Sequence, residues 1–151
     1  MMYFAYGSNM SPAVMAAECP AHSYLGTACL AGRRLTFTRR STRTGTGVAD
    51  IVHDVRGEVW GALYELGSGD LAALDRKEGL GVAYARETVT VMGGAGELLT
   101  AETYTVIAKE PADVRPSQDY AERMLAAGRE RGLPDAHMAA LERLIGGLID
   151  G

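Results

Sequence analysis

The sequence predicts an α+β fold in which a strand-rich body is followed by helices. Short runs of β-branched and aromatic residues, separated by glycine-rich or charged turns, fill most of the chain up to Pro111. Beyond Pro116 the apolar residues recur at helical spacing. The 151 residues are 47% hydrophobic and 23% charged, which suits a single soluble domain over residues 1–151 with a sizeable core.

The first elements are a strand, a tight turn and a short helix. Residues 2–6 form an apolar aromatic run that stops at a Gly-Ser-Asn tripeptide, which predicts a strand entering a turn. Ser11 suits a helix N-cap, Pro12 suits the first helical position, and Pro20 ends the segment.

Strands dominate the middle of the chain. The spacing of four strand-like runs predicts an antiparallel meander or barrel; the runs are residues 25–30, 35–38, 48–52 and 59–66. A helix follows, with Ser68 as its N-cap and Gly79 as its left-handed C-terminal residue. Two more strands, 84–92 and 98–108, are joined by a glycine-rich turn, and the first of them alternates with a period of two.

Two helices complete the predicted order. The first is expected to begin at the N-cap Ser117 and to stop at Gly132, and Pro134 starts the second. The apolar stripe of the second helix indicates packing on the core; it comprises Met138, Leu141, Ile145 and Leu148.

The overall charge limits the partners that we expect. The chain carries a formal net charge of −4 with a pI near 5.4, so no global basic field attracts nucleic acid or an anionic membrane. No apolar stretch approaches the roughly 20 residues that span a bilayer, and the start does not resemble a secretory signal. We therefore expect a cytoplasmic protein, a monomer or a homodimer, that binds a small polar or zwitterionic ligand.

The cysteines indicate neither a disulfide framework nor a metal site. In a reducing compartment, Cys19 and Cys29 are expected to be free thiols. Cys19 and His22 have the spacing of half a metal site, but His53 and His137 offer no second half at ligand spacing. The expectation is that the protein uses no metal and no cofactor.

A basic stretch raises the alternative of a phosphate-binding patch. No acidic residue separates five arginines, which are Arg33, Arg34, Arg39, Arg40 and Arg43. The rest of the chain is acidic and no aromatic platform is interleaved beyond Phe37, so a solvated strand pair and loop is favoured. Residues 44–50 lack the third glycine of a dinucleotide fingerprint and are interpreted as a turn.

Glu78 lies in the segment LDRKEG, at the C-terminal end of its predicted helix. A carboxylate there faces the negative end of the helix dipole, whereas Arg76 and Lys77 suit that end. Local rules are broken most often at functional sites, which makes Glu78 a candidate for proton transfer. An exposed glutamate at a fraying helix end is the alternative, and position alone favours it.

The turn that follows the first strand is the second candidate site. Backbone N–H groups of residues 6–9 are free to converge on one point, and the helix after Ser11 adds its positive end. Such a turn makes a cradle for an anion or an oxyanion, although an ordinary tight turn is the alternative. A hydrolase nucleophile at Ser8 is disfavoured because the G-x-S-x-G elbow is missing.

Several ordered motifs together resemble the γ-glutamylcyclotransferase family over nearly the whole chain. YFAYGSNM at residues 3–10 resembles the signature loop of the family, and VWGALYEL at residues 59–66 resembles one of its strands. LDxxEG at residues 74–79, followed by Tyr84, resembles the catalytic-glutamate segment. PSQDY at residues 116–120 and the later GLP resemble the C-terminal helical portion.

The resemblance implies an antiparallel or mixed β-barrel with flanking helices and a cavity at one mouth. It implies that Glu78 is the general acid and base. The implied substrate-binding residues are Tyr3, Phe4, Ala5, Tyr6, Gly7, Ser8, Asn9, Tyr84 and Tyr120. Two departures from the family are visible: the segment before Tyr84 is one residue shorter, and no basic residue follows soon after Asn9.

The implied reaction is the cyclisation of a γ-glutamyl amide to 5-oxoproline with release of an amine or amino acid. The alternatives are a cyclotransferase for γ-glutamylamines or γ-glutamyl-acylated metabolites, and a non-catalytic γ-glutamyl-binding relative. The sequence does not choose among leaving groups, because that specificity is expected to depend on rim loops at residues 39–47 and 110–115.

Overall fold

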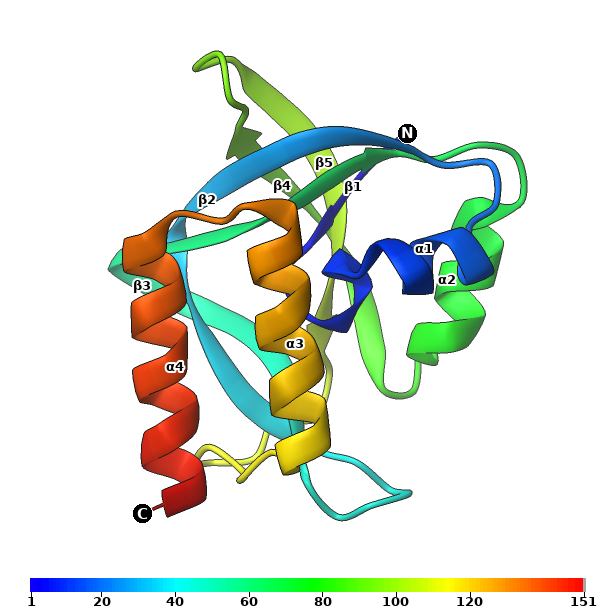
Figure 1. The fold of residues 1–151 in the computed structure, drawn as a ribbon. Helices are drawn as coiled ribbons and strands as arrows, with labels where there is room; N and C mark the ends of the chain where they lie inside the picture. The colour runs from blue at the N-terminus through cyan, green and yellow to red at the C-terminus, as the bar shows by residue number, and fades with distance from the viewer. Residues whose placement is uncertain (151) are drawn as a thin grey trace.

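The computed structural model describes residues 1–150, and these residues form a closed five-stranded barrel with helices packed outside it (Figure 1). Neighbouring strands around the barrel follow the order β1-β3-β2-β4-β5. The strands are β1 Met2–Ala5, β2 Ser23–Arg40, β3 Gly47–Glu65, β4 Tyr84–Met92 and β5 Leu98–Val106. The helices are the 3₁₀ turn η1 Ser8–Met10, α1 Pro12–Glu18, α2 Asp70–Glu78, α3 Gln118–Arg131 and α4 Asp135–Asp150.

The long strands β2 and β3 correct the expectation of four short strands in this region. Their antiparallel pairing runs from Ser23 opposite Glu65 to Arg40 opposite Gly47. Register shifts at Gly26 and beside Gly32 interrupt it, and both glycines have positive φ, 115° and 83°. Gly32, which lies between two of the predicted runs, is therefore part of a bulge, which bends and twists a strand without ending it.

Strand β1 closes the barrel. It pairs antiparallel with β3 through Met2–Ala5 and parallel with β5 where Tyr3 lies opposite Glu102. On the far side, β2 meets β4 at Cys29 and Met92. One parallel contact among antiparallel ones makes the barrel mixed, so the predicted α+β barrel with flanking helices is confirmed.

Most helix boundaries agree with the predicted caps. The Ser11 hydroxyl accepts a hydrogen bond from the Val14 N–H at 3.3 Å, and the Ser117 hydroxyl accepts one from the Tyr120 N–H at 3.1 Å. Gly132 ends α3 in the left-handed conformation, as predicted.

Three boundaries differ from the predictions. Helix α2 begins after Gly69 instead of Ser68, and the Asp70 carboxylate accepts the Gly67 N–H at 2.9 Å beside this start. Strand β1 ends at Ala5, before Tyr6, and β5 ends at Val106 instead of residue 108. The predicted tight turn after β1 takes the form of the 3₁₀ turn η1; its 3₁₀ type was not predicted, because three residues are too short for a periodic signal.

Helices α3 and α4 pack side by side on the barrel (Figure 1). The predicted stripe of α4 is confirmed for Met138, Leu141 and Ile145, which are buried, while Leu148 is half-buried. Gly128 of α3 lies against Met138 of α4, and a Cβ at position 128 would lie 2.8 Å from the Met138 sulfur, so that flexible side chain would have to shift. Within residues 1–150, no helix is long and apolar enough to cross a membrane.

Three of the five clustered arginines form ion pairs. Arg33 is buried and pairs with Glu87, Arg34 lies 3.9 Å from Asp54, and Arg40 lies 3.7 Å from Glu110. These three arginines therefore fit the favoured interpretation of a strand pair and loop. Both cysteines are free thiols, and the buried Cys19 Sγ lies 3.7 Å from the Asp70 carbonyl oxygen.

A buried carboxylate joins three strands at one mouth of the barrel. Asp50 of β3 is fully buried and accepts hydrogen bonds from the Thr38 hydroxyl of β2 at 2.5 Å and the Val106 N–H of β5 at 3.0 Å. The Lys109 ammonium lies 2.6 Å from the same carboxylate. Because a buried charge is tolerated only with such partners, Asp50 fixes how β2, β3 and β5 meet.

Asp50→Ala is expected to lower the free energy of unfolding by at least about 2 kcal/mol, because it leaves the Val106 N–H and the Thr38 hydroxyl buried without an acceptor. Urea titration followed by circular dichroism measures the change. Asp54→Ala, the same substitution at a surface position of the same strand, is the control and is expected to lose less than about 1 kcal/mol. Equal losses in the two variants would contradict the structural role of Asp50.

Candidate active site

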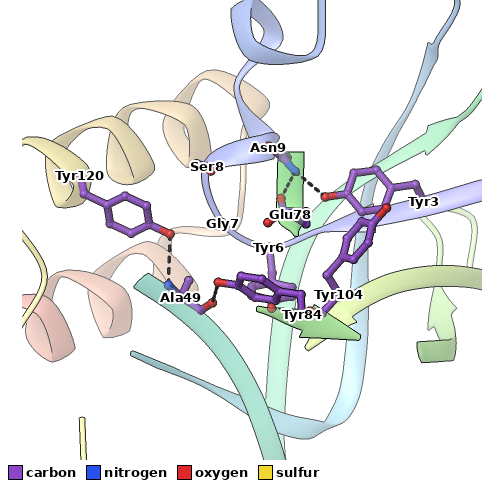
Figure 2. Close-up of a pocket in the computed structure, with 10 residues that line it drawn as sticks. All are labelled: Tyr3, Tyr6, Gly7, Ser8, Asn9, Ala49, Glu78, Tyr84, Tyr104 and Tyr120. Atoms are coloured by element: carbon purple, nitrogen blue, oxygen red, sulfur yellow. Dashed lines mark hydrogen bonds between the residues drawn. The ribbon is translucent and has the colours of Figure 1, made fainter. Parts of the chain in front are cut away.

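A small polar cavity lies at the mouth of the barrel (Figure 2). Five tyrosines line it, at positions 3, 6, 84, 104 and 120, together with Gly7, Ser8, Asn9, Ala49 and Glu78. Its volume is about 40 Å³, and a wider cavity of about 400 Å³ shares Ser8, Glu78, Tyr84 and Tyr120 with it. We call these two spaces the inner and the outer cavity.

The turn after β1 supplies one wall of the inner cavity. The Met10 N–H donates to the Gly7 carbonyl at 3.1 Å, and the Ser11 N–H donates to the Ser8 carbonyl at 3.2 Å. These bonds define the η1 turn, and the N–H groups at its start have no preceding turn to supply an acceptor. The predicted strand-turn-helix opening thus faces the cavity.

Gly7 does not have a left-handed backbone. Its φ is −121°, and a Cβ would lie 3.4 Å from the Ala49 Cβ and 3.6 Å from the Tyr120 hydroxyl. Those distances are ordinary contacts. A side chain at this position would therefore fit the backbone but would project between two residues that line the inner cavity.

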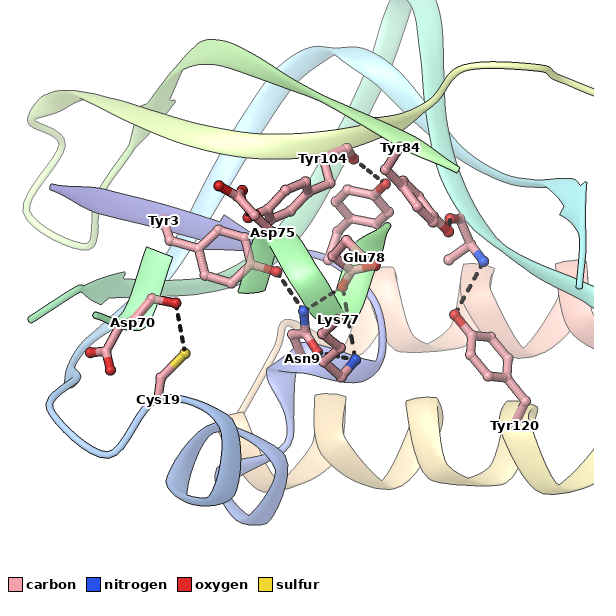
Figure 3. Close-up of polar contacts among 12 residues, drawn as sticks. Tyr3, Asn9, Cys19, Asp70, Asp75, Lys77, Glu78, Tyr84, Tyr104 and Tyr120 are labelled. Atoms are coloured by element: carbon pink, nitrogen blue, oxygen red, sulfur yellow. Dashed lines mark hydrogen bonds and ion pairs between the residues drawn. The ribbon is translucent and has the colours of Figure 1, made fainter. Parts of the chain in front are cut away.

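Glu78 is the last residue of α2, and its side chain is 17% exposed. Its Oε1 accepts a hydrogen bond from the Asn9 amide at 2.7 Å and lies 3.8 Å from the Lys77 ammonium (Figure 3). Gly79 follows in the left-handed conformation with φ of 65°, as predicted. The amide and the ammonium offset the unfavourable helix-end position of this carboxylate.

Asn9 connects the η1 turn to α2. Besides its bond to Glu78, its amide nitrogen donates to the Tyr3 hydroxyl at 2.8 Å, and its amide oxygen accepts from the Lys77 ammonium at 2.8 Å. The Tyr64 hydroxyl donates to the backbone carbonyl oxygen of Asn9 at 2.8 Å. Asn9 is 4% exposed, so its side chain is fixed in place by these partners.

Tyr84 and Tyr120 fix the opposite wall of the inner cavity through hydrogen bonds to the backbone of Ala49. The Tyr84 hydroxyl donates to the Ala49 carbonyl at 2.9 Å, and the Ala49 N–H donates to the Tyr120 hydroxyl at 3.1 Å (Figure 2). Tyr120 lies in the first turn of α3, which the Ser117 cap positions. A tight turn, in which the Ala83 N–H donates to the Gly79 carbonyl at 2.9 Å, brings Tyr84 back to the cavity after Glu78.

Most of the predicted site residues come together here, with two exceptions. Phe4 and Ala5 do not line either cavity, because both are buried in the barrel core. The Phe4 carbonyl oxygen accepts a hydrogen bond from the Thr103 hydroxyl at 2.8 Å, so this part of β1 has a structural contact with β5.

Four residues beside the cavity were not predicted: Ala49, Asp75, Lys77 and Tyr104. Asp75 accepts a hydrogen bond from the Tyr104 hydroxyl at 2.7 Å and lies three residues before Glu78, on the same face of α2. Helical spacing from Glu78 is thus a signal that identifies Asp75. No sequence pattern identifies Ala49 or Tyr104, because their roles depend on pairing between distant strands.

The tyrosines of the inner cavity are held in the neutral form. Burial, reinforced by nearby acidic groups, raises the pKa of Tyr3 and of Tyr6 well above the usual value of 10. Burial likewise raises the pKa of Tyr84 and Tyr104, and it raises the pKa of Tyr120 to about 12. Glu78 is the only carboxyl group among the residues, all within 1–150, that line this cavity.

Comparison with known proteins identifies the class of protein to which this chain is similar. Residues 58–141 match a family model described as the AIG2-like family. A γ-glutamylcyclotransferase from Bos taurus is 30% identical over 138 residues, covering 88% of this chain and 72% of that protein. The one from Homo sapiens is 28% identical over 148 residues, covering 95% of this chain and 78% of that protein.

Solved structures agree with the sequence comparison. The structure of a γ-glutamyl cyclotransferase superposes with a TM-score of 0.87 at 26% identity, covering 94% of this chain and 86% of that chain. The fold is thus the barrel of the AIG2-like proteins. The chain belongs to the γ-glutamylcyclotransferase family, as its motifs predicted.

The five cavity tyrosines give a prediction for alkaline solution. Because their pKa values are raised on folding, the folded chain keeps phenolic protons that the unfolded chain releases above about pH 10, and stability is expected to fall as pH rises through that range. Tyrosinate absorbance should therefore appear together with unfolding seen by circular dichroism, while the urea-unfolded chain titrates near pH 10. Ionisation of all seven tyrosines near pH 10 in the folded protein would contradict this prediction.

Proposed function

We propose that this protein cyclises γ-glutamyl amides to 5-oxoproline and releases the amine or amino acid, with Glu78 as the general acid and base. One observation supports it most directly: a carboxylate fixed by Asn9 faces an inner cavity whose other ionisable groups are neutral phenols. Such a cavity offers one site for proton exchange and several hydroxyls that orient a polar substrate. Family membership supports the same reaction.

The proposed reaction is intramolecular. The α-amine of the substrate attacks its own γ-carbonyl carbon, a carbon–nitrogen bond of the new five-membered lactam forms, and the original amide bond breaks. The attacking nitrogen changes from an ammonium to a lactam N–H and loses two protons, and the leaving nitrogen becomes an ammonium and gains two. No water and no cofactor are consumed, and Glu78 carries protons from one nitrogen to the other.

The inner cavity is suited to hold the folded γ-glutamyl group. Ring closure benefits from a fixed geometry, because a well-oriented intramolecular attack has a high effective molarity. In this proposal, the N–H groups at the start of the η1 turn donate to the developing oxyanion, and the neutral tyrosines orient the substrate's polar groups. In this arrangement the substrate-binding set consists of the predicted residues that line the inner cavity, which are Tyr3, Tyr6, Gly7, Ser8, Asn9, Tyr84 and Tyr120.

The alternative, from another class of function, is a non-catalytic protein that binds γ-glutamyl groups in the same cavity and does not convert them. The contacts of Glu78 with the Asn9 amide and the Lys77 ammonium support catalysis instead, since a pure binding site gains little from an acid–base group held in this way. Release of 5-oxoproline from a panel of γ-glutamyl-amino acids and γ-glutamylamines distinguishes the two functions directly.

Glu78→Gln is expected to lower kcat for 5-oxoproline release by roughly 10²–10⁴ and to leave KM within a few-fold, because an amide keeps the shape of the carboxylate but transfers no proton. Steady-state kinetics with the best substrate of the panel measure both constants. Glu122→Gln, the same change on an exposed part of α3, is the control and should keep the parent kcat. A kcat within a few-fold of the parent in Glu78→Gln would remove Glu78 from the mechanism.

Gly7→Val is expected to lose far more kcat/KM than Ser8→Ala. The valine side chain would occupy space between Ala49 and Tyr120, whereas loss of the Ser8 hydroxyl removes at most one hydrogen bond, about 0.5–1.5 kcal/mol. Circular dichroism should show that both variants fold. The opposite order of activities, or a covalent adduct on Ser8 found by mass spectrometry, would indicate a serine nucleophile instead.

A further inference from the structure

The outer cavity carries an excess of positive charge that the proposed chemistry does not use. Four cationic side chains line it, which are Arg39, Arg43, Arg76 and Lys77, against one carboxylate, Glu78. The formal charge of this lining is therefore +3, whereas the whole chain carries −4. A local charge opposite in sign to that of the molecule concentrates anions at this opening.

Two separate elements supply these cations. Arg39 and Arg43 come from the end of β2 and the loop that joins it to β3, and Arg76 and Lys77 come from the last turn of α2. Within residues 1–150, none of the three arginines forms an ion pair with a carboxylate, in contrast to Arg33, Arg34 and Arg40. Lys77 is already engaged by Asn9 and Glu78.

Helix capping explains only part of this charge. Basic residues at the C-terminal end of α2 interact favourably with the helix dipole, which accounts for Arg76 and Lys77 without a ligand. The same reason does not apply to Arg39 and Arg43, which lie on a hairpin. Like charges brought together from two elements are unfavourable unless an anion lies between them.

The hairpin loop that carries Arg43 is held in a defined shape. The Ser41 N–H donates to the Thr46 carbonyl at 2.8 Å, and the Gly45 N–H donates to the Ser41 carbonyl at 2.8 Å. At its base, the Gly47 N–H donates to the Arg115 carbonyl at 2.8 Å. Of the two rim segments predicted to set specificity, residues 39–47 contribute Arg39, Ser41 and Arg43 to the outer cavity, whereas residues 110–115 do not line it.

We propose that the outer cavity is the leaving-group subsite and that it selects leaving amines that carry two anionic groups, as a dicarboxylic amino acid does. This inference rests on the proposed cyclisation, because Glu78 lies in both cavities and so faces the bond that breaks. One anionic group then meets the hairpin arginines, and the other meets Arg76 beside the end of α2. Leaving amines without an anion, or with an added cation, fit this subsite poorly.

The test compares γ-glutamyl-glutamate with γ-glutamyl-glutamine, which have nearly the same shape and differ by one negative charge. kcat/KM for 5-oxoproline release is expected to be at least about tenfold higher for γ-glutamyl-glutamate, the factor that one charge-assisted hydrogen bond supplies. γ-Glutamyl-butylamine, which has no anion on its leaving group, should be poorer than both. The preference should shrink as salt rises from about 0.05 to 0.5 M, because the arginines are open to screening ions.

Two variants and one matched control connect the preference to these residues. Arg39→Gln and Arg43→Gln should each lower the ratio of kcat/KM between γ-glutamyl-glutamate and γ-glutamyl-glutamine, and the double variant should bring it to within about threefold of unity. Arg56→Gln removes the same charge from an exposed position of β3 that lines neither cavity, so it should keep the parent ratio. An equal loss of preference in Arg56→Gln would assign the effect to net charge and overturn the subsite.

Binding to Glu78→Gln separates this inference from the proposed function. Calorimetry should show tighter binding of γ-glutamyl-glutamate than of γ-glutamyl-glutamine to that variant. If no substrate yields 5-oxoproline but this difference in binding remains, the cyclisation is overturned and the anionic subsite is supported. If both dipeptides react with equal kcat/KM, the subsite is overturned and the cyclisation is supported.

Discussion

The position of one short segment of β3 constrains the rest of the barrel mouth. Asp50 is held by the Thr38 hydroxyl of β2 and the Val106 N–H of β5, and the residue before it, Ala49, is held by Tyr84 and Tyr120. Because Asp50 is buried, its carboxylate depends on these partners. The cavity wall at Ala49 therefore adjoins a residue whose contacts hold β2, β3 and β5 together.

The opposite wall of the inner cavity depends on a polar network centred on Asn9. The side chain of Asn9 contacts Tyr3, Glu78 and Lys77 at 2.7–2.8 Å, and its two kinds of polar atom divide these roles between donor and acceptor. The network connects the start of the barrel to the end of α2, two regions that lie far apart in the sequence. Glu78 is thus positioned by Asn9 although its own helix dipole disfavours it there.

The sequence identified the elements that have local signals. Ser11 and Ser117 marked helix starts and Gly79 and Gly132 marked helix ends, because capping depends on the identity of single residues. The bulge at Gly32 could not be distinguished from a turn, since a glycine with positive φ serves both. Ala49 and Tyr104 were missed for another reason: their roles arise from strand pairing and packing at long sequence separation.

The two cavities differ in what holds their walls. Tyrosines from β1, β4 and β5 enclose the inner cavity and belong to the hydrophobic core, so substitutions there disturb folding as well as binding. The outer cavity is lined by exposed cationic ends of α2 and of the β2–β3 hairpin, whose backbone is fixed by its own hydrogen bonds. Charges there can change without loss of the fold, because surface substitutions alter stability little. For the proposed cyclisation, the inner cavity is therefore the fixed site of the γ-glutamyl group, and the outer cavity is a rim on which the choice of leaving group can vary.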